Sequence, residues 1–182
     1  MIFVTSKEVE NRRNRGYEEI NIYAPCDQRL EEAAEIAKLV TKAFSNVELG
    51  PGIGLFEGQA IDNYESDSGR RDAREKDEKK DWRRIQSKHL NACHSSLSFF
   101  DSMGMRFHLP AFICCELKGE YHQGLEISLS GIDDWKIDKL SRLSTDQKGS
   151  IATFIQFLME DADSEFSRPL MEADLIKYWL VN

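Results

Sequence analysis

The chain has 182 residues, of which 24 are basic and 32 acidic, so its formal charge at pH 7 is −8. A hydrophobic fraction of 41% excludes a disordered chain, and the length suffices for one domain with a hydrophobic core. The acidic balance disfavours general binding to nucleic acids or membrane surfaces. We therefore expect residues 1–182 to form a single domain.

Residues 1–26 form an N-terminal extension with an ambiguous pattern. Ile2–Val4 and Ile20–Tyr23 resemble strand fragments, and the polar stretch Asn11–Gly16 between them favours a turn. A β-hairpin is one hypothesis for this extension. A helix that begins at Ser6 is the other, and the pattern does not choose between them.

A helix of about five turns is predicted from Asp27 to about Ser45, because apolar residues recur there every three or four positions. Asp27 is typical of an N-cap. The stretch Leu49–Gly54 then ends the helical pattern. Its alternating glycines resemble a phosphate-binding loop, but a helix precedes it and no Gly-Lys-Ser/Thr follows, so we predict a plain turn. The apolar stripe of the helix consists of Leu30, Ala33, Ala34, Ala37, Val40 and Phe44.

Residues 65–81 are densely charged and carry almost no apolar side chain. Two alternatives stay open for this segment. It is either an exposed helix held by pairs such as Arg71–Glu75 and Glu75–Lys79, or a mobile linker. The apolar residues Trp82 and Ile85 then return the chain to the core.

Two further helices and a short strand are predicted in the middle of the chain. Gly104 favours a turn, and Met105–Leu109 alternate as in a strand. Pro110 suits the first turn of a helix that ends at Gly119. Before them, Ser87 can cap a helix that carries on one side Leu90, Cys93, Leu97 and Phe100.

The last third of the chain combines one expected strand with two helices. Alternating Leu125, Ile127 and Leu129 indicate an edge strand within the ambiguous residues 120–140. We therefore predict an α+β, mainly helical fold with about five to six helices and a few short strands. Ser144–Gln147 is a capping box, and Ser167 with Pro169 opens a last helix. The helix after the capping box is expected to bury Ile151, Phe154, Ile155 and Leu158.

The sequence predicts a cytoplasmic protein. Apolar Met1–Val4 is followed directly by charged residues, so no secretory signal core forms. The longest apolar run, Leu109–Cys115, is far shorter than the ~20 residues of a membrane span. The four cysteines show no C-x-x-C spacing, which favours reduced thiols.

Several stretches resemble a family of uncharacterised bacterial proteins, a domain of unknown function. The resemblance covers roughly residues 30–182, and its most specific piece is Arg106–Ala111, where His108 occupies a position at which tyrosine is more usual. It implies a bacterial, cytoplasmic, mostly helical domain, and it implies no activity. The other stretches are Gly52–Glu57, Ala60–Tyr64, Asp81-Trp82, Leu97–Asp101, Gly104-Met105, Leu143–Gln147 and Tyr178-Trp179.

Four charged residues in apolar surroundings are the candidates for chemistry: Glu57, Asp62, Asp101 and Arg106. A buried charge must be paired or functional, because an isolated one costs several kcal/mol. The structural interpretation is that Asp101 pairs with Arg106 across the Gly104 turn, while Asp62 caps a helix. The functional interpretation makes Glu57 and Asp62 a catalytic pair.

Ligand binding has three candidate residues, Trp82, Asp101 and His108. Trp82 follows the charged segment and can form the floor of a cleft that this segment covers. His89 and Cys93 stand one helical turn apart, but His94 diverges by roughly 100° on a helix, so these three cannot converge on a metal. We expect no metal and no cofactor.

Three functional hypotheses follow. The first is an interaction or regulatory domain that binds another protein without catalysis of its own. The second is a small ligand-binding or hydrolase-like enzyme with a cleft formed by Glu57, Asp62 and Arg106 near Trp82. The third is a nucleic-acid-associated protein, ranked last because acidic residues interrupt its basic cluster at 70–84. That cluster comprises Arg70, Arg71, Arg74, Lys79, Lys80, Arg83 and Arg84.

Overall fold

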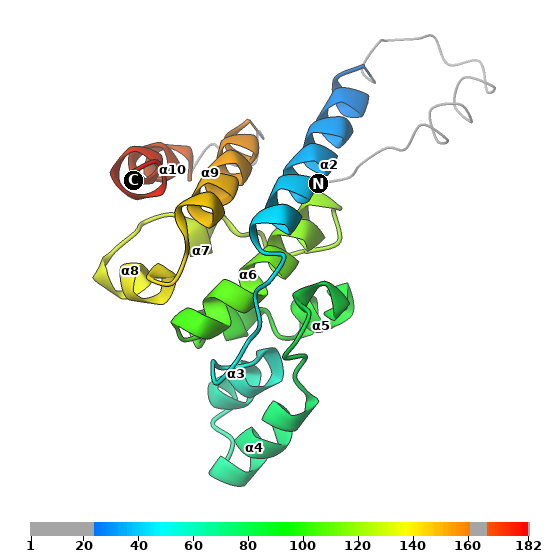
Figure 1. The fold of residues 1–182 in the computed structure, drawn as a ribbon, viewed down its shortest axis with the longest axis vertical. Helices are drawn as coiled ribbons and strands as arrows, with labels where there is room; N and C mark the ends of the chain where they lie inside the picture. The colour runs from blue at the N-terminus through cyan, green and yellow to red at the C-terminus, as the bar shows by residue number, and fades with distance from the viewer. Residues whose placement is uncertain (1–23, 161–166, 182) are drawn as a thin grey trace, which may run out of the picture.

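The computed structural model describes residues 24–160 and 167–181, and every regular element within these ranges is helical (Figure 1). Residues 1–23, to which the hairpin and helix hypotheses apply, lie outside the described residues. Two short 3-10 helices, η1 (Trp82–Arg84) and η2 (His94–Ser98), and a π-helical turn, η4 (Leu175–Trp179), accompany the α-helices. The nine α-helices of the described part are α2 (Ala24–Ala43), α3 (Leu55–Asp62), α4 (Asp67–Lys76), α5 (Ser87–Ala92), α6 (Ser102–Leu117), α7 (Glu126–Leu129), α8 (Asp134–Leu140), α9 (Thr145–Met159) and α10 (Arg168–Asp174).

The prediction of an α+β fold with short strands and five to six helices is therefore wrong. Residues 125–129, expected as an edge strand, contain α7. Leu125 and Leu129 are buried, whereas Ile127 between them is 84% exposed. A strand would place all three on one face, while a helical turn brings the residues four apart to the same side. Because Ile127 is apolar as well, apolar and polar residues alternate from Leu125 to Leu129 as they would in a strand.

The strand expected at Met105–Leu109 is likewise part of a helix, α6. Asp101 caps this helix, since its Oδ1 accepts a hydrogen bond from Gly104 N at 2.7 Å. Gly104 thus lies in the first turn, and Pro110 lies inside the helix rather than at its start. Nearly every side chain from Gly104 to Ile113 is buried, so burial on all sides masks the helical period.

The hydrophobic core lies where α2 packs against both α6 and α9 (Figure 1). Phe112 of α6, Phe44 just after α2 and Phe154 of α9 are completely buried. Leu175 and Trp179 in η4 extend the same cluster towards the C-terminus. The core thus joins segments that are far apart in the sequence.

Three predicted helix starts, at α9, α5 and α2, can be compared with the structure. The capping box at α9 is confirmed, because Ser144 Oγ accepts from Gln147 N and Gln147 Oε1 accepts from Ser144 N. The helix expected after Ser87 is shorter than predicted: α5 stops at Ala92 and η2 follows. Its N-cap is Gln86, and Ser87 Oγ instead donates to Glu120. The start of α2 at Ala24 also places Asp27 in the first turn instead of at the cap.

Most of the charged segment at 65–81 forms helix α4, which lies beside α3 at one end of the molecule (Figure 1). The ion pairs found between described residues do not include the expected pairs Arg71–Glu75 and Glu75–Lys79. Arg74 instead reaches across to Glu57 of α3 at 3.2 Å.

Within the described ranges, no helix combines the length and apolarity that crossing a bilayer requires.

Candidate functional site

The carboxylates that the sequence singled out on α3 have local partners. Glu57 Oε2 accepts from Gly54 N at 3.3 Å and from Arg74 Nη1 at 3.2 Å. Asp62 lies at the end of α3, where its Oδ2 accepts from Gln59 Nε2 at 3.2 Å, so it caps no helix start and that prediction is wrong. Glu57 therefore links α3 to α4, whereas the hydrogen bond of Asp62 lies within α3 itself.

Arg106 takes part in a different junction. Its Nε donates to Gln147 Oε1 at 3.1 Å, and Gln147 Nε2 donates to Ala43 O at 3.2 Å, which ties α6 to α9 and to the end of α2. Asp101 does not pair with it: Asp101 Oδ1 accepts from Gly104 N and, at 3.1 Å, from Ile53 N. The prediction of an Asp101–Arg106 pair is thus wrong, because the Asp101 carboxylate caps α6 instead.

Asp77, which was not among the residues predicted from the sequence, organises the α3–α4 corner. Its Oδ1 accepts from Phe56 N at 2.7 Å and its Oδ2 from Glu57 N at 3.3 Å, so the carboxylate caps α3 from outside that helix. Burial raises the pKa of Asp77 to about 6. A Cβ on Gly54 would collide with this carboxylate, which explains the glycine. Asp77 stands in a run of charged residues, where no pattern distinguishes it.

His108 is completely buried in α6 and stacks on Phe100, with ring centroids 4.4 Å apart. Its Nδ1 lies 2.8 Å from Gly104 O, and since a carbonyl only accepts, Nδ1 carries the proton. Burial lowers the pKa of His108 to about 4, so the ring is neutral near pH 7. Nε2 has no hydrogen-bond partner among the described residues, and leaving such a buried acceptor unpaired costs about 1–3 kcal/mol.

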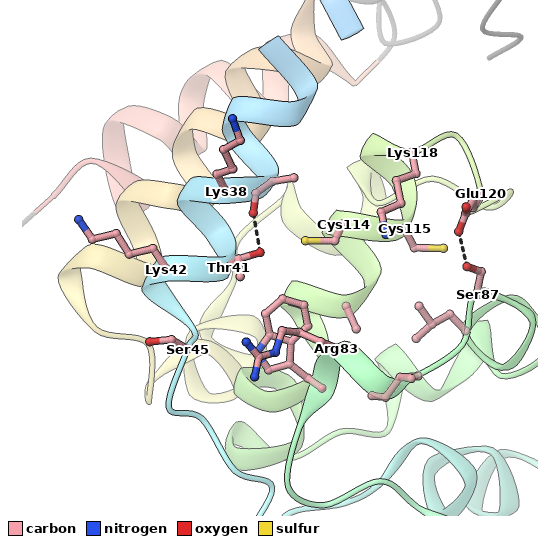
Figure 2. A pocket seen from close by; sticks show the side chains of 15 residues that line it. Lys38, Thr41, Lys42, Ser45, Arg83, Ser87, Cys114, Cys115, Lys118 and Glu120 are labelled. Atoms are coloured by element: carbon pink, nitrogen blue, oxygen red, sulfur yellow. Dashed lines mark hydrogen bonds between the residues drawn. The ribbon is translucent and has the colours of Figure 1, made fainter. Parts of the chain in front are cut away.

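A pocket lies between α2 and α6 and is bordered at one end by η1 and α5; we call it the α2/α6 pocket (Figure 2). Its volume of about 520 Å³ is within the range of small-molecule sites. Trp82 lines it and is fixed by donating Nε1 to Phe44 O at 2.9 Å. The other apolar and thiol side chains that line it are Ala37, Ile85, Leu90, Ala111, Cys114 and Cys115.

The rim of the α2/α6 pocket is basic although the whole chain is acidic. Lys38 and Lys42 extend from successive turns of α2, Arg83 comes from η1, and Lys118 follows α6 (Figure 2). Glu120 is the acidic residue among the lining side chains, and it accepts from Ser87. Lys38 and Arg83 also pair with acids, Glu35 and Asp81, but all four cationic residues stay exposed to solvent.

The two adjacent thiols of the pocket are not arranged for nucleophilic catalysis. Burial raises the pKa of both Cys114 and Cys115, so they stay protonated near neutral pH. Thr41 Oγ1 donates to Ala37 O and Ser87 Oγ donates to Glu120, and no histidine lines this pocket. The lining therefore suits binding of an anionic ligand with an apolar part.

The basic cluster at 70–84 is largely neutralised within the described residues. Lys80 pairs with Glu48, Arg83 with Asp81 and Arg84 with Glu78, in addition to the Arg74–Glu57 pair. These cations therefore face neighbouring carboxylates and do not form one continuous basic surface.

The described part also contains no group of three or more His, Cys, Asp or Glu side chains that could hold a metal ion. His89 packs its ring edge against Phe56 instead.

Comparison with known proteins identifies a protein family for most of the chain. No curated protein and no solved structure matches it. The sequences of a family described as "Family of unknown function (DUF6714)" match residues 32–182, which include α3 to α10 and most of α2. This range agrees with the resemblance noted for roughly residues 30–182. The chain therefore belongs to this family of unknown function.

Proposed function

We propose that this domain is a non-catalytic binding module whose α2/α6 pocket receives an acidic segment of a partner protein. The observation that carries the proposal is the combination of an apolar, tryptophan-lined pocket with four cationic side chains at its rim. A chain of net charge −8 concentrates positive charge there, opposite to its overall sign. Complementary charge at a rim increases association rates and selects partners.

The spacing of the rim cations favours a helical segment as the occupant. Lys38 and Lys42 lie one helical turn apart on α2, so acids one turn apart on a partner helix can face both. An apolar residue on the same side of that helix would then enter the pocket towards Trp82 and Ala111. Amphipathic helices bind hydrophobic grooves in this way.

The absence of catalysis in this proposal is supported by how the candidate groups are used. Glu57 binds Arg74 of α4 and Asp62 binds Gln59 within α3, while Arg106 binds Gln147 at the junction of α6 and α9. The thiols in the pocket have raised pKa values. The hydrolase-like hypothesis therefore lacks an assembled set of groups in the part of the chain that is described.

A bacterial, cytoplasmic setting belongs to the same proposal. The resemblance to bacterial proteins, carried most specifically by Arg106–Ala111, supports the origin. Three described cysteines, Cys93, Cys114 and Cys115, are unbridged and buried or half-buried, which agrees with a reducing compartment.

Fluorescence anisotropy tests the proposal with a labelled helical peptide that carries leucines on one side and glutamates beside them. We expect the Lys42→Glu/Lys118→Glu variant to bind at least about tenfold more weakly, because two attractive charges become repulsive. Ala37→Phe, which narrows the pocket without changing charge, should weaken binding too. The matched control, Lys88→Glu/Lys177→Glu, reverses two exposed charges outside the lining and should bind like the original chain.

Equal binding by the rim variant and its control would reduce the interaction to general charge attraction and overturn the proposal. A titration with octanoate separates the two classes of anion. If octanoate binds at the pocket and the peptide does not, the α2/α6 pocket is a small-molecule site and the protein partner is excluded.

A further inference from the structure

Helix α8 exposes a side that combines apolar and acidic residues. Trp135 is 55% exposed, and it lines one small hollow together with Ile127 of α7, the apolar residue that is 84% exposed. Tryptophan is enriched where proteins bind one another and contributes strongly to their binding energy. This surface therefore has the composition of an interaction site. Around the helix, the exposed side of α8 consists in order of Ile137, Asp134, Asp138 and Trp135.

The two lysines of α8 do not neutralise this surface, because their ammonium groups bind backbone carbonyls. Lys136 Nζ donates to Ile127 O at 2.6 Å, and Lys139 Nζ donates to Ser98 O. Lys139 Nζ also lies 3.8 Å from the centre of the Trp135 ring, so it covers one face of the indole. The carbonyls thus hold both positive charges on the inner side of the helix, away from the exposed acids.

The acids of α8 stay available for a partner. Asp134 and Asp138 are exposed, and neither takes part in the ion pairs found between described residues. Arg142, which follows the helix, pairs with neither of them in that part of the chain. The outer side of α8 therefore carries two unpaired negative charges beside an exposed indole.

This surface is complementary to the α2/α6 pocket. Asp134 and Asp138 are four residues apart on α8, as are Lys38 and Lys42 on α2, so two adjacent helices can bring both pairs of opposite charges together. Trp135 lies on the same side as the two acids. The pocket of about 520 Å³ behind the lysines is large enough for its indole ring.

Within one chain the two surfaces do not meet. None of the described residues that line the α2/α6 pocket belongs to α7 or α8. Figure 1 shows α8 at one edge of the molecule, whereas α5, which borders the pocket, lies towards the opposite edge. Each chain thus presents both the pocket and a surface of the kind that the pocket fits.

We propose that α8 of one copy of this chain docks in the α2/α6 pocket of a second copy, with Trp135 entering the pocket. The two acids of α8 then face Lys38 and Lys42. This rests on the function proposed above for the pocket and names its partner. The two surfaces differ, so the contact is head-to-tail, and each copy keeps one free surface for a further copy unless a ring closes.

Sedimentation velocity at rising protein concentration tests the proposal. We expect the average mass of the original chain to increase with concentration at low salt and to return to the monomer value at high salt, because salt screens exposed charges. Asp134→Lys/Asp138→Lys and Trp135→Ala should each raise the Kd of association at least about tenfold. The matched control, Asp72→Lys/Glu75→Lys, reverses two exposed acids of α4 and should associate like the original chain.

A mixture of two non-associating variants gives the sharpest test. Lys42→Glu/Lys118→Glu makes the rim repel α8, and Asp134→Lys/Asp138→Lys makes α8 repel the rim, so each variant by itself should stay monomeric. When the two are mixed, the α8 of either variant meets an oppositely charged rim on the other, and association should return. The overall charge cannot cause this recovery, because both variants stay net negative when the original chain carries −8.

Three results would overturn the proposal: an original chain that is monomeric at every concentration, a mixture that stays monomeric, or a rim variant that associates like the original chain. In the last case α8 binds a different surface. A monomeric chain whose pocket still binds the labelled acidic peptide would refute self-association and leave the proposed function standing. Failure of the proposed function itself appears in the peptide titration, as equal binding by the rim variant and its control.

Discussion

Helix α6 packs against α2 through apolar side chains, whereas α3 meets α4 and the turn after it through carboxylates, a guanidinium and backbone amides. The two regions are neighbours (Figure 1) but depend on different forces. In the core around Phe112, stability depends on volume and buried area. In the α3–α4 corner it depends on a few directional contacts that centre on Asp77 and Arg74.

This difference teaches how the charged segment becomes ordered. Helix α4 has no buried residue of its own, so apolar packing cannot hold it. Arg74 instead donates to the carbonyls of Gly50 and Gly52 and to Glu57, which anchors α4 on the turn before α3. Asp77, directly after α4, then caps α3. Polar contacts near the C-terminal end of α4 thus hold in place a segment for which the sequence alone left a mobile linker as one alternative.

The largest effect is expected in the core. Phe112→Ala should lower the free energy of unfolding by about 3–5 kcal/mol, because the ring is completely buried and its removal leaves a cavity. Urea denaturation measures the change. Leu39→Ala on α2 is the control; its side chain is 45% exposed, and its cost should be below about 1 kcal/mol. A loss for Phe112→Ala as small as that of the control would show that the core is not centred on α6.

The next largest effect is expected at Asp77. Asp77→Asn should cost about 1–3 kcal/mol at pH 8, because an amide has one oxygen to accept from Phe56 N and turns its NH₂ group towards Glu57 N. Urea denaturation again gives the value. The control, Asp72→Asn, changes an exposed carboxylate of α4 and should alter stability by no more than about 0.5 kcal/mol.

The pH dependence of the same pair of variants sharpens the result. Burial raises the pKa of Asp77 from 3.8 to about 6, so between these values the folded protein binds a proton that the unfolded chain does not. The original chain therefore gains stability as the pH falls through 6, and Asp77→Asn lacks this gain. The cost of Asp77→Asn should be larger at pH 5 than at pH 8, while that of Asp72→Asn stays constant. A cost that shrinks at pH 5 would contradict the raised pKa.

The smallest effect is the coupling between Arg74 and Glu57, which a double-mutant cycle with Arg74→Met and Glu57→Gln measures. Both side chains are only 19% exposed, so we expect about 1–2 kcal/mol of coupling. The comparison pair, Lys80 and Glu48, is 74% and 58% exposed and should give at most about 0.5 kcal/mol. Equal couplings would mean that the α3–α4 corner gains nothing from burying its ion pair.

Prediction from sequence worked where the signal is contained in a few consecutive residues. The α9 start is an example, because Ser144 and Gln147 satisfy each other's backbone amides within a single turn. The buried stripe that follows, from Ile151 to Leu158, has a clean helical period. The prediction of strands failed at two places. In Met105–Leu109 burial on all sides of the helix hides the helical period. In Leu125–Leu129 the exposed apolar residue Ile127 makes the pattern alternate as in a strand.

The candidate site was predictable only in part. Trp82 was identified as a residue beside a cleft, and it does line the α2/α6 pocket, but the charged segment does not cover that pocket. Lys42 and Lys118 belong to segments distant in sequence, so their common rim has no local signature. His108 was named without its environment, and Asp77 was not named at all.

The sequence by itself determined a mainly helical chain, the start of α9 and the apolar stripe that α9 buries. Capping and hydrophobic periodicity act over one or two helical turns, so both are visible in consecutive residues. Only the tertiary structure decided the partners of the charged groups. Asp101 could have paired with Arg106 five residues away, yet it caps α6, while Arg106 binds Gln147, 41 residues further along. A carboxylate accepts from whichever donors packing brings within reach, and in this domain those donors are backbone amides and side chains from other helices.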